Sequence, residues 1–223
     1  MMLFCRVVFR AGSALALALF VASCATPPDT RHHVVISVPE QRMALLEDGA
    51  VMATFPISTS KFAIGDSPGS RGTPLGELEI ARKIGGSAPL GAVFKDRRRT
   101  GEILAPDAPG RDPIVTRILW LRGREAGNAN AYGRYIYIHG TPEERNIGRP
   151  ASYGCVRMRS RDVIRLYEVV GEGARVSILD ASLAAGLPVS TPAGPAVAAQ
   201  PAPVTADGAP LVERDALSSR DSR

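Results

Sequence analysis

Aromatic residues and clustered basic charge are both scarce in this sequence. Phe, Tyr and Trp together make up 5% of the 223 residues, and the arginines are scattered along the chain. No zinc-finger, helix-turn-helix or RNA-binding signature is present, so nucleic acid is not an expected partner. The net charge is nevertheless +5, which favours anionic partners such as membrane surfaces and polymers. The 45% share of hydrophobic residues suits a single globular domain with tails.

Long apolar runs are also missing, and the one near the N-terminus is short. Residues 11–21 follow two arginines and are too few to span a bilayer, which takes about 20 residues. We therefore interpret residues 1–23 as a signal peptide. It ends in Val-Ala-Ser-Cys, which resembles the lipobox of bacterial lipoproteins, and this implies that Cys24 is lipidated. The alternative is an ordinary secretory signal with Cys24 as a bystander.

The lipoprotein resemblance carries expectations about location. It implies a lipid-anchored protein of the cell envelope, on the periplasmic side. Ala25, rather than Asp, follows the lipidation site, which favours the outer membrane over the inner one. Residues 24–32 are then a short linker between the anchor and the domain.

Cysteine is nearly absent from the rest of the chain. Of the three cysteines, Cys5 leaves with the signal peptide and Cys24 carries lipid, so Cys155 is the one remaining thiol. A lone thiol in an oxidising compartment is either a small buried hydrophobe or a nucleophile. His32 and His33 lie at the edge of the domain, which leaves His139 as the natural base.

Apolar runs separated by Gly and Pro predict a mostly-β domain over residues 33–180 with one principal helix. The helix is expected to start with Ser160 as its cap and to end at Gly171, because the apolar residues between them follow helical spacing. Asp48-Gly49 predicts a hairpin turn. The expected strands are residues 34–38, 42–46, 51–57, 78–81, 118–121, 135–139 and 175–179.

Two segments fall outside this pattern. Residues 95–113 hold several charged residues, then Gly, Pro and Asp, and are expected to form an exposed loop. Two interpretations are open: the loop takes part in binding or forms a lid, or it is a solvated surface loop with neither role. Residues 186–223 are rich in Pro, Ala and Ser, which predicts a disordered tail.

The residues around Cys155 point to nucleophilic chemistry. Strand alternation would place His139 on the face opposite Ile136 and Ile138. The amides of Gly154 and Cys155 could form an oxyanion hole, and the carbonyl of Gly140 would serve to orient the imidazole. Arg157 is expected to stabilise the thiolate or hold a substrate carboxylate, with a surface ion pair as the alternative.

These motifs resemble those of L,D-transpeptidases with the YkuD-type catalytic domain. The resemblance rests on His-Gly-Thr at 139–141 and Ser-Tyr-Gly-Cys-Val-Arg-Met at 152–158, supported by residues 55–61 and 72–78. It covers roughly residues 33–180. It implies a β-sandwich-like catalytic domain and acyl transfer on the stem peptides of peptidoglycan.

Carried over residue by residue, the resemblance makes Cys155 the nucleophile and His139 the base. Ser152, Gly154 and Arg157 fall on motif positions that shape the pocket, whereas Tyr153 replaces the histidine usual in the family. For Ser152 and Thr141, turn chemistry and direct substrate contact both remain open.

Three outcomes of the chemistry are open. The protein joins stem peptides, or it hydrolyses the same bonds as a carboxypeptidase or endopeptidase, or it is a weakly active, lipid-anchored wall binder. No cofactor is expected. No metal site is expected either, because His32 and His33 lack ligand partners at suitable spacing and are interpreted as exposed.

Overall fold

The computed structural model describes residues 26–188. The signal peptide, Cys24 and the tail from residue 189 onward lie outside the described residues, so the expectations for them stay predictions. Within residues 26–188, no helix is long and apolar enough to cross a membrane.

Strands make up most of the described part of the chain, together with one α-helix and three short 3-10 turns. The elements are β1 (His32–Ser37), β2 (Arg42–Glu47), β3 (Ala50–Pro56), β4 (Gly76–Ile84), β5 (Ala92–Lys95), β6 (Arg98–Ile103), β7 (Ile114–Gly123), η1 (Ala126–Asn128), β8 (Tyr137–Gly140), η2 (Glu144–Asn146), β9 (Val156–Met158), α1 (Ser160–Val169), β10 (Arg175–Leu179) and η3 (Leu183–Gly186).

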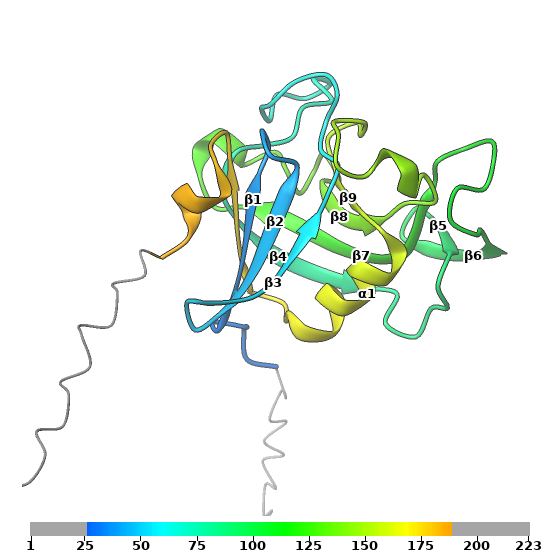
Figure 1. Ribbon diagram of the computed structural model, residues 1–223, viewed down its shortest axis with the longest axis horizontal. Helices are drawn as coiled ribbons and strands as arrows, with labels where there is room; N and C mark the ends of the chain where they lie inside the picture. The colour runs from blue at the N-terminus through cyan, green and yellow to red at the C-terminus, as the bar shows by residue number, and fades with distance from the viewer. Residues whose placement is uncertain (1–25, 189–223) are drawn as a thin grey trace, which may run out of the picture. The chain divides into compact units, whose positions relative to one another are not determined.

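The strands form one hydrogen-bonded network that branches at β7. The main path runs β3-β2-β1-β10-β4-β7-β5-β6, while β8 pairs with β7 on one side and with β9 on the other. Most pairs are antiparallel, but β1 pairs with β10 in parallel and β8 with β9 in parallel. In Figure 1, β1, β2 and β3 lie in front of β4 and β7, so that strands from different parts of the path face one another.

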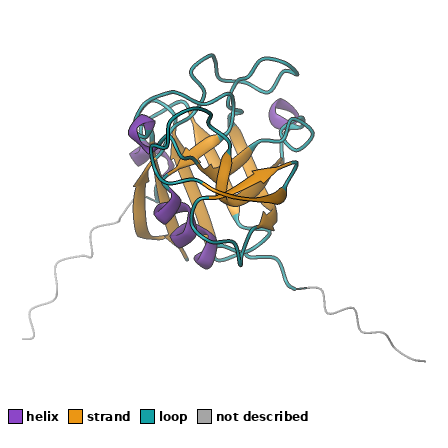
Figure 2. Ribbon diagram, turned by 90° about the vertical axis from the view of Figure 1, so that its right-hand side faces the viewer, coloured by secondary structure: helices purple, strands orange, loops and turns teal. Residues whose placement is uncertain are grey.

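The main core fills the space between these strands and α1. Helix α1 packs against β7 and β8 through buried Val163 and Leu166. Figure 2 shows α1 lying along the strands. The same core holds Ile138, Val156 and Met158, which are fully buried. One face of strands β8 and β9 therefore packs in the main core, and the side chains on the opposite face make their contacts outside it.

The prediction of a mostly-β domain with one principal helix is confirmed. The Asp48-Gly49 hairpin is also confirmed: these residues have φ of 48° and 85°, as a type I′ turn requires, and they join β2 to β3. Each expected strand overlaps an observed one, with small shifts at the ends. The strand expected from 135 begins instead at Tyr137, because Tyr135 has a φ of 60°.

Two local predictions were wrong. Residues 95–113 are not one exposed loop, because β6 occupies residues 98–103 and pairs with β5. Ser160 does not cap α1, since Arg159 occupies the cap position and contributes no side-chain bond. The Ser160 amide instead donates to the Glu144 carboxylate at 2.8 Å, so an acidic side chain from η2 takes the capping role.

The folded region also extends beyond the expected bounds of 33–180. At its start, Asp29 accepts a hydrogen bond from the Gly171 amide at 2.6 Å. At its end, Leu183 and Leu187 pack on a small core formed with β1 and β2. His32 and His33 were expected to be exposed, but both are partly buried: His32 pairs with Asp29 at 2.8 Å, and His33 bonds Ser177 at 2.7 Å.

Candidate active site

Parallel pairing of β8 with β9 places His139 and Cys155 on adjoining segments of the sheet. His139 lies opposite Arg157 in the register, and Cys155 directly precedes β9. Cys155 packs with Tyr137 and Ile118 in a second apolar cluster, separate from the main core that holds Ile138 and Val156. The alternation expected from the sequence is therefore present: His139 projects from the face opposite Ile138.

The imidazole of His139 is buried and held by its own strand. Its Nδ1 lies 2.8 Å from the carbonyl oxygen of Gly140, the contact expected from the sequence. Because a carbonyl oxygen only accepts, Nδ1 must carry the proton, which leaves Nε2 with a free lone pair. Burial lowers the pKa of His139 to about 4, against the Gly140 contact that raises it, and the charge of Arg157 lowers it further. The imidazole is thus neutral at neutral pH.

Cys155 as a residue is partly exposed, and its thiol donates a hydrogen bond to the carbonyl of Tyr135 at 3.4 Å. Burial of the sulfur raises the pKa of the Cys155 thiol to about 11, although the backbone of Tyr137 and the charges of Arg157 and Arg134 lower it. The resting pair is therefore a neutral thiol and a neutral imidazole, rather than a thiolate and an imidazolium.

The turn before the cysteine is shaped by Ser152. Its hydroxyl donates to the Cys155 carbonyl at 2.6 Å and accepts from the Gly154 amide at 3.2 Å, and it is fully buried. Of the two open interpretations of Ser152, the structure favours turn chemistry. The Gly154 amide is thus already engaged, so of the two oxyanion donors expected from the sequence only the Cys155 amide remains.

Two glycines at the site have no room for a side chain. Gly154 has a φ of 122°, and a Cβ there would lie 3.1 Å from the Gly72 carbonyl oxygen. A Cβ at Gly140 would lie 2.6 Å from the Val115 carbonyl oxygen. Gly140 lets β8 pass close to neighbouring backbone, and Gly154 does the same for the nucleophile turn.

Arg157 lies in a buried ion pair. Its guanidinium contacts the Asp112 carboxylate and also donates to the Ala151 carbonyl at 3.1 Å, while Glu143 lies 4.0 Å away. The ion-pair partner of Arg157 is therefore a largely buried carboxylate, and not the exposed surface group that the sequence left open as the alternative. Thr141 belongs to the same network, because its hydroxyl donates to Asp112 at 2.5 Å. Arg157 and Thr141 are held in place by the protein itself.

Tyr153 is not part of this hydrogen-bonded network. Its side chain is 55% exposed and contacts the ring of Phe62. Together with Lys61, Asp112, Arg157 and others, it lines a cavity of about 420 Å³ on one side of the nucleophile turn. A second cavity of about 280 Å³ is lined by Tyr135 and Tyr137 among others. Along the chain, Cys155 lies between Tyr153 and Arg157, which both line the first of these cavities.

Sequence reasoning missed Asp112 and Tyr135. Asp112 lies in the segment expected to be an exposed loop, and nothing in the local sequence indicates that it reaches Arg157, 45 residues later. Tyr135 could have been noticed only through its conformation, since a bulky residue at φ 60° is uncommon and often functional. Within residues 26–188, no group of three or more His, Cys, Asp or Glu side chains could hold a metal ion.

The chain is similar to known proteins over most of its described residues. Residues 31–178 match the family model YkuD, the L,D-transpeptidase catalytic domain. The putative L,D-transpeptidase YkuD of Bacillus subtilis (strain 168) is 26% identical over 170 residues, which cover 76% of this chain and 79% of that protein. The probable L,D-transpeptidase YbiS of Escherichia coli (strain K12) is 30% identical over 160 residues, 69% of this chain and 46% of that protein, so the match spans less than half of YbiS.

Among solved structures, the L,D-transpeptidase (residues 123–326) from Xylanimonas cellulosilytica DSM 15894 aligns at 19% identity. The alignment covers 70% of this chain and 63% of that chain, with a TM-score of 0.43. The family match covers most of the described residues, including both strands that carry the candidate site. The chain belongs to the L,D-transpeptidase catalytic-domain family.

Proposed function

We propose that this protein carries out cysteine-dependent acyl transfer on the stem peptides of peptidoglycan, with Cys155 as nucleophile and His139 as general base. The observation that carries the proposal is the contact between His139 Nδ1 and the Gly140 carbonyl, with the partly exposed Cys155 directly before the neighbouring strand. This contact supports the proposed role, because it orients the imidazole and leaves Nε2 free to accept a proton.

Acylation starts from the neutral pair. Cys155 Sγ attacks the carbonyl carbon of the scissile bond as its proton moves to His139 Nε2, which forms a tetrahedral intermediate. The Cys155 amide is the proposed donor to the oxyanion, because the Gly154 amide is already engaged by Ser152. Collapse of the intermediate breaks the C–N bond, and the leaving amine takes the proton from Nε2. The product is a thioester on Cys155.

The thioester is then resolved by an acceptor. An incoming amine loses a proton to His139 as it attacks the thioester carbonyl, and sulfur leaves and regains a proton from Nε2. This step joins two stem peptides. If water replaces the amine, the same steps hydrolyse the bond. Cys155 is partly exposed, which gives both acceptors access to the acyl-enzyme.

The surrounding residues act mainly by positioning. Ser152 and Gly154 shape the nucleophile turn, and Gly140 orients the imidazole. The Arg157 charge lowers the pKa of the thiol and thereby favours attack. These roles are supported by the contacts, and each can be tested by substitution.

The reaction can be tested with muropeptides and mass spectrometry. Cross-linked products would support transfer, trimmed peptides would support hydrolysis, and no turnover would leave the wall-binding interpretation. Cys155→Ala is expected to abolish turnover, and His139→Gln to reduce it at least about a hundredfold, within the usual range for a general base. His33→Gln is a matched control, since His33 is a partly buried histidine on a different strand. Undiminished turnover by Cys155→Ala would refute the mechanism.

We further propose that Cys24 is lipidated and that the enzyme acts in the periplasm, anchored to the envelope and to the outer membrane in particular. The support is the Val-Ala-Ser-Cys sequence and the Ala25 that follows it. Metabolic labelling with a fatty acid tests this proposal. Label in the wild type and none in Cys24→Ser is the expected result. Equal labelling of both would contradict it.

A further inference from the structure

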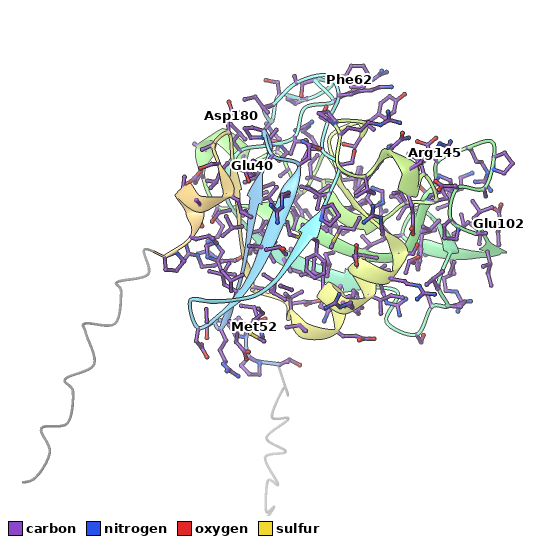
Figure 3. All side chains as sticks on the ribbon, viewed as in Figure 1. Glu40, Met52, Phe62, Glu102, Arg145 and Asp180 are labelled. Carbon is purple, nitrogen blue, oxygen red and sulfur yellow. The ribbon has the colours of Figure 1, made fainter. Side chains whose placement is uncertain are left out.

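Phe62 and Tyr153 form an exposed aromatic pair beside the nucleophile turn. Their ring centroids lie 5.1 Å apart at an interplanar angle of 53°, and the two residues are 48% and 55% exposed. Scattered exposed hydrophobic residues need no explanation, but two aromatic side chains in contact at a site do. Phe62 lies in the loop at the top of the view in Figure 3.

Two cations share these rings. Lys61 Nζ lies 5.3 Å from the Phe62 centroid and 4.8 Å from the Tyr153 centroid. The Arg71 guanidinium lies 5.4 Å and 5.6 Å from the same two centroids. Within residues 26–188, neither cation forms an ion pair. We call Lys61, Phe62, Arg71 and Tyr153 the aromatic platform.

The backbone beneath the aromatic platform is fixed to the nucleophile turn. The Lys61 amide donates to the Ser152 carbonyl at 3.1 Å, and the Thr73 hydroxyl donates to the Gly154 carbonyl at 3.0 Å. These bonds tie both ends of the loop that carries Phe62 to the residues just before Cys155. The aromatic pair is therefore not needed to join the two segments, and the backbone that carries it is fixed, which lowers the entropic cost of binding a ligand.

Two residues of the aromatic platform line a cavity beside the nucleophile turn. Lys61 and Tyr153 line the same cavity of about 420 Å³ as Arg157. Tyr153 is two residues from Cys155, so their Cα atoms are at most about 7 Å apart. Three extended residues of a substrate peptide cover about 10 Å. When a substrate peptide acylates Cys155, the group three residues upstream of the acylated residue therefore lies near the aromatic platform.

We propose that the aromatic platform binds the sugar-proximal part of the substrate. The apolar C–H face of a pyranose ring of the glycan strand packs on the rings of Phe62 and Tyr153. Lys61 and Arg71 pair with free carboxylates of the stem peptide that this sugar carries. The inference rests on the proposed function, because it assumes that peptidoglycan is the substrate. It assigns a role to Tyr153, the residue that departs from the family motif.

Binding measurements test the proposal without turnover. The full chain carrying Cys155→Ala is titrated calorimetrically with a stem tetrapeptide, and separately with the same peptide attached to its disaccharide. The disaccharide form is expected to bind about tenfold more tightly. Phe62→Ala or Phe62→Leu should remove that difference, whereas Tyr153→Phe should keep it. Met52→Ala is the control, since Met52 is 56% exposed and lies far from Phe62 in Figure 3.

The cations give a second readout. Lys61→Met and Arg71→Met should weaken both ligands by a similar factor, because the carboxylates belong to the peptide. Equal affinity for the two ligands, or a sugar-dependent gain that survives both Phe62 variants, would overturn the proposal. Failure of the proposed function would look different: wild-type protein would form no thioester with either ligand, whatever their affinities.

Discussion

Removing Asp112 is expected to destabilise the fold and to change the reactivity of Cys155 at the same time. Asp112 is the direct carboxylate partner of Arg157, and the two side chains are 15% and 8% exposed. In Asp112→Ala the guanidinium stays buried with only the Ala151 carbonyl at 3.1 Å and Glu143 at 4.0 Å. The Thr141 hydroxyl also loses its acceptor.

The magnitude follows from these contacts. Breaking a buried ion pair by removing one partner costs about 3–5 kcal/mol, and the remaining acceptors around Arg157 place this case near 3 kcal/mol. At about 2–4 °C per kcal/mol for a domain of this size, the melting temperature should fall by about 6–12 °C. The uncompensated charge also stabilises a thiolate more strongly, so the pKa of Cys155 should fall in the variant.

Thermal unfolding and alkylation of Cys155 by iodoacetamide at pH 8 measure the two effects. Glu102→Ala is the matched control, because Glu102 pairs with Arg111, the neighbour of Asp112, and both side chains of that pair are exposed. The control should stay within about 0.5 kcal/mol of the wild type. A shift in Asp112→Ala below about 2 °C with unchanged alkylation would refute the reasoning, since Arg157 would then not depend on its partner.

Three further predictions concern the site itself. With a pKa of about 11, the Cys155 thiol should react with iodoacetamide about tenfold faster per pH unit from pH 7 to 10, and a plateau near pH 7 would contradict the neutral pair. Because the pKa of His139 is lowered to about 4 on folding, its neutral form stabilises the fold above pH 6.5, and that contribution is lost as the pH falls from 6.5 to 4. The wild-type unfolding free energy should fall more steeply over this window than that of His139→Gln, and parallel curves would argue against a buried neutral imidazole. Gly154→Ala should cost about 1–3 kcal/mol and most of the turnover, because of its φ of 122° and the contact with Gly72. Gly127→Ala is the control, since a Cβ there has nothing within 4 Å, and equal effects of the two would refute the role of Gly154.

Strands with a strong apolar signal could be predicted from the sequence, and weak ones could not. β10 occupies the residues expected of it, because Val176 and Ile178 alternate toward the core. β6 could not be predicted, since all its residues are exposed and it is held by backbone pairing to β5. β9 has only three residues, too few for a periodic pattern.

In the active site too, local features could be predicted from the sequence and long-range contacts could not. The His139 contact with Gly140 could be predicted, because the two residues are adjacent and the geometry is local. The contact of Cys155 with Tyr135 depends on how the residues just before β8 and just before β9 lie side by side, and that of Arg157 with Asp112 depends on where β7 lies. Burial of the thiol also depends on tertiary packing, so the direction of its pKa shift could not be predicted from neighbours in the sequence.

The place of β10 in the sheet has a consequence for how the chain acquires its fold. β10 is the last strand, yet it lies between β1 and β4, and its parallel partner β1 is the first strand. The hairpins of β1–β3 can form early, but they stay unconnected to β4 and β7 until residues 175–179 have been synthesised. Such long-range pairing slows folding. During synthesis the sheet therefore stays incomplete until almost the whole domain has been made. A truncation before residue 175 would divide the sheet into two parts rather than shorten it.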